Sequence, residues 1–326
     1  MKRNTAADVA KGIAIALMVI GHCYCKENVV LKMIYAFHMP FFFVMSGFLY
    51  AEKWRDTVKI NFGRSCAKLL IPYVVFELLF VVFLTVLQRP ENLVGQILNT
   101  FATRVLTLEG YSVSWFLPCQ LLVAVLAALI VRLTKAKRRW LGASVFTVIF
   151  MVGLFAPLPT RYLTTLWRVF IGMGFFAVGY YAEPLIKKKA KLWILLPTAV
   201  AFVTLALLND MPSLVSLDFA NPALYVINGI LGSYLLLQIC LRIKENRLSK
   251  GIANLGKNTV IILCTHMFVV EIVRLLDYKL FNNALPRLGI FEGFVFGGIV
   301  IAVMCGVIPL CNRFFWYLFG NFRRKA

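Results

Sequence analysis

The chain has 326 residues, of which 61% are hydrophobic, and its mean hydropathy is +0.81. Soluble domains are about 45–50% apolar, so this composition excludes an ordinary soluble protein and indicates a polytopic membrane protein. The formal net charge of +21 suggests nucleic acid only in a soluble chain. No basic stripe interleaved with aromatic residues is present, which argues against a nucleic-acid partner and leaves the lipid bilayer as the expected surroundings.

Apolar runs separated by breakers predict an all-α polytopic membrane protein, with about ten transmembrane helices around a polar cavity. A helix needs roughly 20 apolar residues to cross a bilayer, and runs of about that length recur along the chain. They form one integral-membrane domain over residues 1–326. The predicted spans lie near 8–25, 33–51, 68–87, 114–133, 141–157, 165–186, 192–209, 222–241, 259–277 and 290–312.

The first predicted span resembles a signal peptide, because Lys2 and Arg3 precede an apolar run. A small-residue cleavage site is missing, and the bulky His22 stands where processing requires a small residue. The segment is therefore expected to remain as the first helix.

This first helix carries one polar stripe. Lys11 and His22 are eleven residues apart, so they face the same side of a helix about 16 Å from each other. Asp8 precedes Lys11 by three residues and shares that face. Ionisable residues in lipid usually mark functional sites, and histidine exchanges protons near neutral pH. The stripe predicts acid–base chemistry within the membrane; the alternative for His22 is a packing role, with its ring bonded to a neighbouring helix.

The basic residues predict the orientation. With the N-terminus placed inside, 26 of the 35 Lys and Arg residues fall on the cytoplasmic side of the predicted spans and 9 on or near the other side. The positive-inside rule then places both termini in the cytoplasm and favours an even number of spans. The external segments, including 88–113 and 209–221, are too short for a separate domain.

Four further residues are candidates for the site, each with a structural alternative. His38 lies in a span two residues before Pro40. It either belongs to the functional site or hydrogen-bonds to the backbone carbonyl that the proline leaves without a partner. His266 is a similar case in a later span. Arg168, at the outer end of a span, contacts a bound substrate or one of the histidines, or instead extends to the lipid headgroups. Trp115 stacks on the ring of a bound substrate or instead belongs to the interfacial aromatic belt.

The eight cysteines are scattered, mostly in apolar segments. They show neither a C-x-x-C pair nor a His/Cys spacing typical of metal ligands, so no metal site is expected. We therefore expect the cysteines to act as small buried hydrophobic residues.

Taken in order, five segments of the chain resemble the signature of the membrane acyltransferase 3 family. The lysine at position 11 especially resembles the fucose 4-O-acetylase-like branch of that family. The segments are Asp8-Val-Ala-Lys11-Gly12 with Gly21-His22; Phe37-His38-Met39-Pro40-Phe41-Phe42 with Ser46-Gly47; Ser114-Trp115-Phe116-Leu117-Pro118; Arg168-Val-Phe with Phe175-Phe176-Ala-Val-Gly179-Tyr180-Tyr181; and Gly256-Lys-Asn-Thr259 with His266.

The resemblance implies a membrane O-acyltransferase, most often an O-acetyltransferase. Such a protein moves an acyl group from cytoplasmic acyl-CoA to a hydroxyl of a sugar or lipid-linked glycan of the cell envelope. It implies acetyl-CoA as a co-substrate, no permanently bound cofactor, and a multi-pass location in the inner (plasma) membrane. The family's active-site histidine matches His22, and its usual arginine is Lys11 here, a point charge in place of a planar fork.

On this basis His22 and Asp8 are the predicted catalytic residues and Lys11 the predicted donor-binding residue. His38, Trp115, Arg168 and His266 are the predicted substrate-binding residues. His22 acts either as a general base or as the carrier of an acyl group, and the sequence does not choose between the two. The competing functions are a proton-coupled transporter or exporter of a small polar solute or lipid-linked sugar, and a purely structural membrane subunit.

Overall fold

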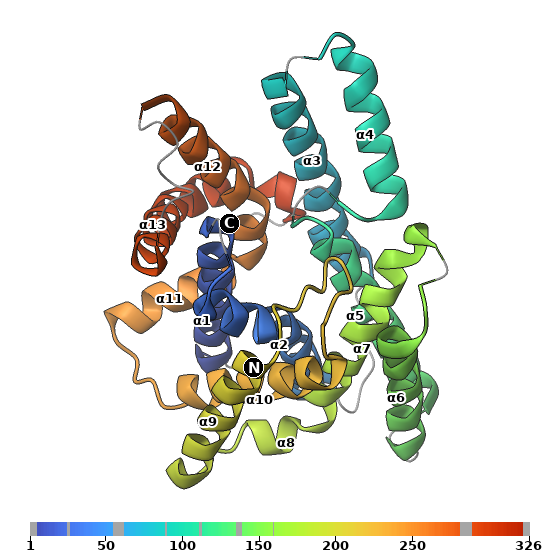
Figure 1. The fold of residues 1–326 in the computed structure, drawn as a ribbon. Helices are drawn as coiled ribbons and strands as arrows, with labels where there is room; N and C mark the ends of the chain where they lie inside the picture. The colour runs from blue at the N-terminus through green and yellow to red at the C-terminus, as the bar shows by residue number, and fades with distance from the viewer. Residues whose placement is uncertain are drawn as a thin grey trace.

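The computed structural model describes residues 5–24, 27–54, 62–88, 90–110, 113–134, 139–158, 160–280 and 289–321. Within these residues the protein is all-α and contains no strand, only an isolated bridge between Ser213 and Asp218. Helices α1 and α2 lie near the centre, and the other helices surround them (Figure 1). The predicted all-α class is confirmed.

Ten helices occupy the ten ranges predicted to span the membrane. They are α1 (Thr5–Cys23), α2 (Val29–Trp54), α3 (Phe62–Gln88), α5 (Phe116–Thr134), α6 (Arg139–Phe155), α7 (Thr164–Tyr181), α9 (Leu192–Leu208), α10 (Pro222–Cys240), α12 (Thr259–Leu280) and α13 (Ile290–Phe314). Within the described residues, seven are long and apolar enough to cross a membrane, namely α1, α2, α3, α5, α10, α12 and α13. That all ten cross the bilayer stays a prediction.

Two helices of 11 or more residues were not predicted. Helix α4 (Leu93–Thr107) fills most of the segment predicted as an external loop, and it returns beside α3, where Tyr73 Oη donates to the carbonyl of Arg104 at 2.9 Å. Helix α11 (Arg247–Lys257) follows a capping box of Asn246 and Ser249 and packs against α1. Neither has an apolar run, because polar residues alternate with apolar ones, and hydropathy alone therefore missed both.

Shorter elements complete the chain. They are the one-turn helix α8 (Glu183–Ile186) and two 3₁₀ turns, η2 (Arg161–Leu163) and η4 (Trp316–Phe319). The start of α10 is well defined, because the Asn221 side chain accepts from the backbone N–H groups of Ala223 and Leu224 and Pro222 follows it.

Helices α2 and α7 cross at a pair of glycines. A Cβ added to Gly47 of α2 would overlap the carbonyl oxygen of Phe176, and a Cβ added to Gly179 of α7 would overlap the carbonyl oxygen of Val44. Small residues at such a crossing let two backbones approach closely, which is how membrane helices commonly associate. Gly47 and Gly179 belong to two of the five segments that resemble the family signature. Close backbone contact is the physical reason for glycine at both positions.

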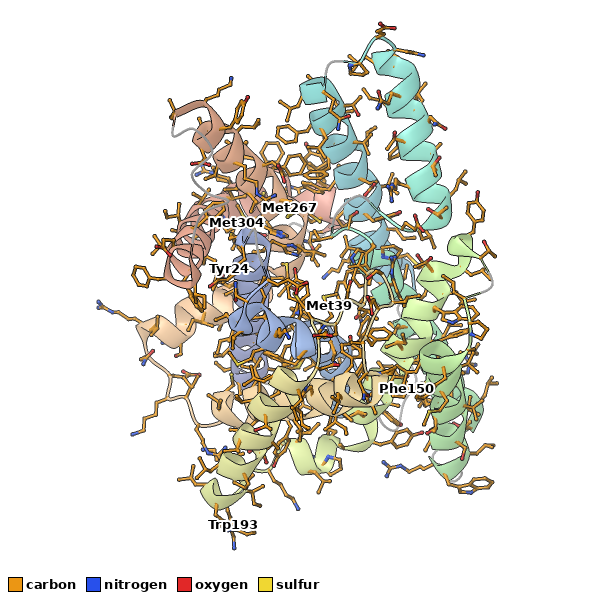
Figure 2. The ribbon with its side chains drawn as sticks, in the orientation of Figure 1. Tyr24, Met39, Phe150, Trp193, Met267 and Met304 are labelled. Carbon is orange, nitrogen blue, oxygen red and sulfur yellow. The ribbon has the colours of Figure 1, made fainter. Side chains whose placement is uncertain are left out.

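The buried side chains form two apolar clusters on either side of the centre. One gathers mainly around α2, α5, α7 and α10, and the other around α1, α12 and α13. Figure 2 shows Met39 of α2 in the middle of the molecule and Trp193 at the far end of α9. Trp193 is 71% exposed, and many other large apolar side chains are exposed on the outside as well. Such a surface suits contact with lipid tails, which are as apolar as leucine.

Candidate active site

The three histidines of the chain come from three helices and meet in one place. The ring centroids of His22 (α1) and His266 (α12) are 5.5 Å apart. Tyr35 of α2 lies edge-on to both His22, at 6.5 Å, and His38, at 4.9 Å. We call these four residues the imidazole cluster. Tyr35 was not predicted, although its position three residues before His38 places both on one helical face.

Hydrogen bonds orient two of the imidazole rings. His38 Nδ1 lies 2.8 Å from the carbonyl oxygen of Ile34, and His266 Nδ1 lies 2.8 Å from that of Ile262. A carbonyl only accepts, so Nδ1 carries the proton in each ring and Nε2 of the neutral ring is an acceptor. His266 Nε2 is buried and has no hydrogen-bond partner among the described residues. The ring of His38 bonds to Ile34 and not to the carbonyl freed by proline, so that alternative for His38 is wrong.

The end of α1 is anchored through the backbone of His22. Arg274 Nη2 donates to the carbonyl oxygen of His22 at 3.1 Å, and Arg274 Nη1 pairs with Glu271 at 2.9 Å. The imidazole of His22 takes no part in this anchor. The ring is therefore held beside His266 by a contact that does not depend on the ring itself.

The imidazole cluster faces a cavity of about 250 Å³, which we call the histidine cavity. Its polar wall includes His22, Tyr35 and His38, and the rest is largely apolar. The other lining residues are Met18, Met39, Val113, Trp115, Phe116, Pro212, Ser213, Leu214, Val215, Tyr225 and Leu263. A mostly apolar cavity with a few convergent polar groups is typical of a small-molecule site.

A second cavity, of about 180 Å³, adjoins the first, and we call it the glutamine cavity. Its polar lining residues are Gln120 and Thr259, and it extends along α1 to Ile15. Four residues line both cavities: Met18, Met39, Phe116 and Leu263. These four apolar side chains therefore lie at the boundary between the two cavities.

One face of α1 runs along both cavities. Lys11, Ile15, Met18 and His22 are four, three and four residues apart, a spacing that places them on the same side of a helix. Ile15 and Met18 line the glutamine cavity, and Met18 and His22 line the histidine cavity. Lys11 continues this face beyond Ile15, so the order along the helix is cation, glutamine cavity, histidine cavity.

Asp8 belongs to the Lys11 end of this face. Its Oδ1 lies 2.9 Å from Lys11 Nζ, and its side chain is buried where α1 meets α11. It is fourteen residues from His22, about 21 Å along the helix axis. The geometry therefore supports a role in holding Lys11, and it gives no contact through which Asp8 would act on the His22 imidazole.

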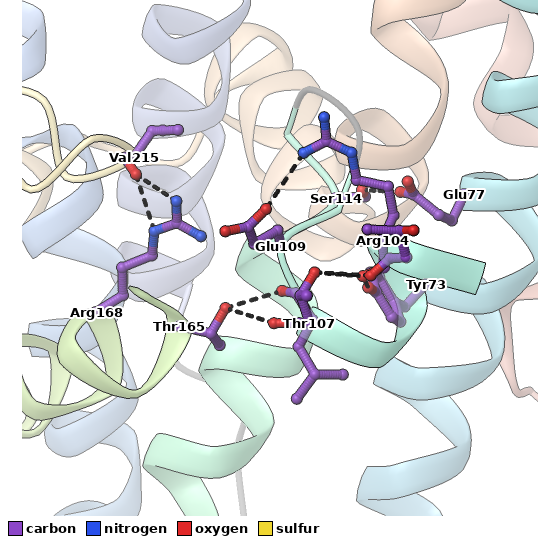
Figure 3. Close-up of polar contacts among 11 residues, drawn as sticks. Tyr73, Glu77, Arg104, Thr107, Glu109, Ser114, Thr165, Arg168 and Val215 are labelled. Atoms are coloured by element: carbon purple, nitrogen blue, oxygen red, sulfur yellow. Dashed lines mark hydrogen bonds and ion pairs between the residues drawn. The ribbon is translucent and has the colours of Figure 1, made fainter. Parts of the chain in front are cut away.

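Trp115 lines the histidine cavity, and Arg168 packs against its ring from outside the cavity lining. The guanidinium of Arg168 lies 4.9 Å from the centre of the Trp115 ring, and both side chains are buried. Arg168 Nε donates to the carbonyl oxygen of Val215 at 3.1 Å, and Nη2 donates to the same oxygen (Figure 3). Its Nη1 has no hydrogen-bond partner among the described residues. Arg168 does not reach outward as a lipid-facing arginine would.

The carbonyl that Arg168 holds belongs to the segment 209–221, part of which lines the histidine cavity. Two further contacts fix this segment. Asn209 Nδ2 donates to the carbonyl of Phe219 at 3.1 Å, and Lys32 Nζ donates to the carbonyl of Asn209 at 3.3 Å. The prediction that 209–221 contains no span agrees with the structure, and four of its residues, Pro212, Ser213, Leu214 and Val215, line the cavity.

Residues that precede Trp115 in the chain form polar contacts with α3, α4 and α7 (Figure 3). Ser114 Oγ donates to the buried carboxylate of Glu77, and Arg104 pairs with Glu109 at 3.5 Å. Thr165 Oγ1 donates to the carbonyl oxygen of Leu108 at 3.1 Å. Leu108, Glu109 and Ser114 are thereby held in place, and Ser114 directly precedes Trp115.

The predicted site residues therefore fall into three groups. His22, His38 and His266 come together. Arg168 holds Trp115 and Val215, which line the histidine cavity. Lys11 and Asp8 form a pair at the other end of α1. Among the described residues, no group of three or more His, Cys, Asp or Glu side chains could hold a metal ion.

Comparison with known proteins gives one match over nearly the whole chain. A family model described as an acyltransferase domain matches residues 4–311. No curated protein and no solved structure was found to match. The matched region contains both cavities and every candidate site residue.

Proposed function

Since this chain belongs to the acyltransferase family whose model matches residues 4–311, we propose that it is a membrane O-acetyltransferase. It moves an acetyl group from cytoplasmic acetyl-CoA to a hydroxyl of a sugar or lipid-linked glycan of the cell envelope. The family and the long apolar helices give a multi-pass membrane acyltransferase. The donor, the acceptor, the inner membrane and the cytoplasmic termini are parts of the proposal, as is kinship with the fucose 4-O-acetylase-like branch.

The observation that carries the proposal is the face of α1 that runs along both cavities. CoA ends in charged phosphates and carries its thioester on a long pantetheine arm. Lys11 supplies a cation at one end of the face, and His22 supplies an imidazole about 16 Å away at the other. The two adjoining cavities lie between them. This order supports a donor whose phosphates stay near Lys11 while its thioester lies beside His22.

The imidazole cluster suits acetyl transfer to an alcohol. As the acceptor oxygen attacks the thioester carbon, His22 takes the hydroxyl proton. The carbon–sulfur bond then breaks, and the proton passes from the imidazolium to the leaving sulfur, which gives CoA and an acetyl ester. His266 lies beside His22, and His38 and Tyr35 complete that wall of the histidine cavity. A covalent acetyl-His22 followed by transfer to the hydroxyl uses the same residues.

The acceptor is proposed to occupy the histidine cavity next to Trp115 and the segment 209–221. An indole face offers a surface on which a sugar ring stacks, and Trp115 is held there by Arg168 and by the network before α5. The positive-inside orientation directs this side of the cavity outward. Acceptor and donor would then reach His22 from opposite sides of the membrane.

Membrane vesicles of the two orientations test this proposal. When labelled acetyl-CoA is supplied to inverted vesicles, which expose the cytoplasmic face, label should appear in envelope glycans only if the membranes contain this protein. Sealed right-side-out vesicles should incorporate none, because CoA does not cross the bilayer. If neither vesicle preparation yields labelled glycan, the proposed acetyl transfer to a glycan is contradicted. Label in right-side-out vesicles alone contradicts the donor side and leaves the transfer itself intact.

Lys11 gives a prediction for donor affinity. Lys11→Ala should weaken CoA binding about tenfold, as expected when a charge-assisted contact to phosphate is lost, and Lys11→Arg should keep most of it because the charge remains. Calorimetric titration of the purified protein with CoA measures both. Lys187→Ala is the matched control, since that lysine pairs with Glu183 of α8 at 2.8 Å, away from α1. Unchanged CoA affinity in Lys11→Ala would show that Lys11 does not serve the donor.

A further inference from the structure

One amide side chain, Gln120, lines the otherwise largely apolar glutamine cavity. It projects from α5, and its Nε2 donates to Ser46 Oγ of α2 at 2.9 Å. Its Oε1 is buried and has no hydrogen-bond partner among the described residues. A buried polar atom without a partner is costly, and native structures usually satisfy such atoms with protein, water or ligand. Ser46 adjoins Gly47 in the second of the five sequence segments, and Gln120 lies outside all five.

Ser46 holds the amide of Gln120 whichever way the amide is turned. If the amide is rotated by half a turn, the Ser46 hydroxyl donates to Oε1 in place of accepting from Nε2. In the orientation of the structure the other end of the amide, Oε1, has no hydrogen-bond partner among the described residues. Gln120 is thus a side chain held in place with one hydrogen-bonding atom to spare.

The position of this atom identifies the chemistry it suits. The glutamine cavity lies along α1 between Lys11 and the histidine cavity, and its apolar lining includes Ile15, Met18 and Leu263. An amide on an extended, otherwise apolar chain matches such a space, because its N–H or C=O pairs with the free atom of Gln120. The pantetheine arm of CoA is a chain of this kind, with two secondary amides between the phosphates and the thioester.

We propose that Gln120, held by Ser46, binds an amide of the pantetheine arm in the glutamine cavity and so sets how far the thioester reaches toward His22. The inference rests on the proposed function, since it requires CoA as donor. It adds a binding residue that recognises the arm and not the phosphates. Gln120 touches the donor away from the reacting carbon, so it acts on affinity and reach and takes no part in the proton transfer.

Two ligands separate recognition of the arm from recognition of the phosphates. The first is CoA, and the second is adenosine bisphosphate, a CoA fragment without the pantetheine arm. Calorimetric titration of the purified full chain gives a dissociation constant for each. Gln120→Leu, which keeps the size of the side chain and removes its polar atoms, should weaken CoA binding about tenfold and leave the fragment unchanged. Lys11→Ala should instead weaken both ligands by a similar factor.

The outcome is decided by the dissociation constant for CoA divided by that for the fragment. A ratio that rises about tenfold in Gln120→Leu and less in Ser46→Ala supports the inference, because Ser46 only positions the amide. A ratio that stays at the wild-type value in Gln120→Leu overturns it. Where Gln120→Leu does not fold, Gln120→Met replaces it under the same criterion. If the wild-type chain binds neither ligand, the donor assignment of the proposed function is wrong; if it binds both and the ratio does not move, only the role of Gln120 is wrong.

Discussion

His22→Ala should lower acetyl transfer by two orders of magnitude or more, the largest loss we expect from any single substitution. Removal of a general base typically costs about 10²–10⁴ in rate, and removal of an acyl-carrying nucleophile costs at least as much. Transfer of label from acetyl-CoA to envelope glycans measures the effect. The protein should still fold, because Arg274 holds the main-chain carbonyl of His22 and this contact survives truncation of the side chain.

Two controls accompany this variant. CoA affinity should change little in His22→Ala, since the proposal places the phosphates at the Lys11 end of α1. An unchanged affinity would show that the variant keeps its donor site. Added imidazole should restore part of the activity by occupying the space of the missing ring. A variant that turns over at a near-normal rate would remove His22 from the chemistry and favour the transporter among the functions considered from the sequence.

Gly47→Ala should strongly destabilise the folded protein, and so should Gly179→Ala, because both glycines lie where α2 and α7 cross. The new Cβ would overlap the carbonyl oxygen of Phe176, so the two backbones must move apart. Overpacking of this kind typically costs about 1–3 kcal/mol and more when the obstacle is backbone. Thermal unfolding in detergent should therefore show a clear drop in the midpoint temperature.

Gly306→Ala provides the matched control for Gly47→Ala. Gly306 also lies inside a long apolar helix, α13, but an added Cβ there meets nothing within 4 Å. Alanine has the higher helix propensity, so this change should be neutral or slightly stabilising. Equal midpoints for the two variants would contradict close backbone contact between α2 and α7.

The sequence predicted the positions of the ten long apolar helices well, because long apolar runs can be recognised one segment at a time. It missed α4 and α11 for the same reason. Helix α4 mixes Gln96, Asn99 and Arg104 among its apolar residues, and α11 lies in a basic stretch. Hydropathy measures how a segment interacts with its surroundings, and amphipathic helices that pack on a neighbour lack the run on which the prediction depends.

The candidate site was predictable only where its residues stand out against an apolar background. His22, His38 and His266 were found because charge-bearing rings are rare in spans, and the structure brings them together. Tyr35 and Gln120 are ordinary residues in a span, and their significance comes from what lies opposite them on other helices. Which residues of different helices face each other depends on tertiary packing, which one sequence without relatives does not reveal.

The four apolar side chains between the two cavities have a consequence for the energetics of the cell. A passage that admits a water-soluble donor from one side of the membrane and a glycan from the other would, if filled with water, conduct protons down the transmembrane gradient. Met18, Met39, Phe116 and Leu263 offer no hydrogen-bonding groups along which a chain of waters would persist. Two of the four are methionines, whose unbranched side chains move aside easily. In the proposed function the same wall would yield to a thioester and still insulate the membrane, so that ester formation would not dissipate the proton-motive force.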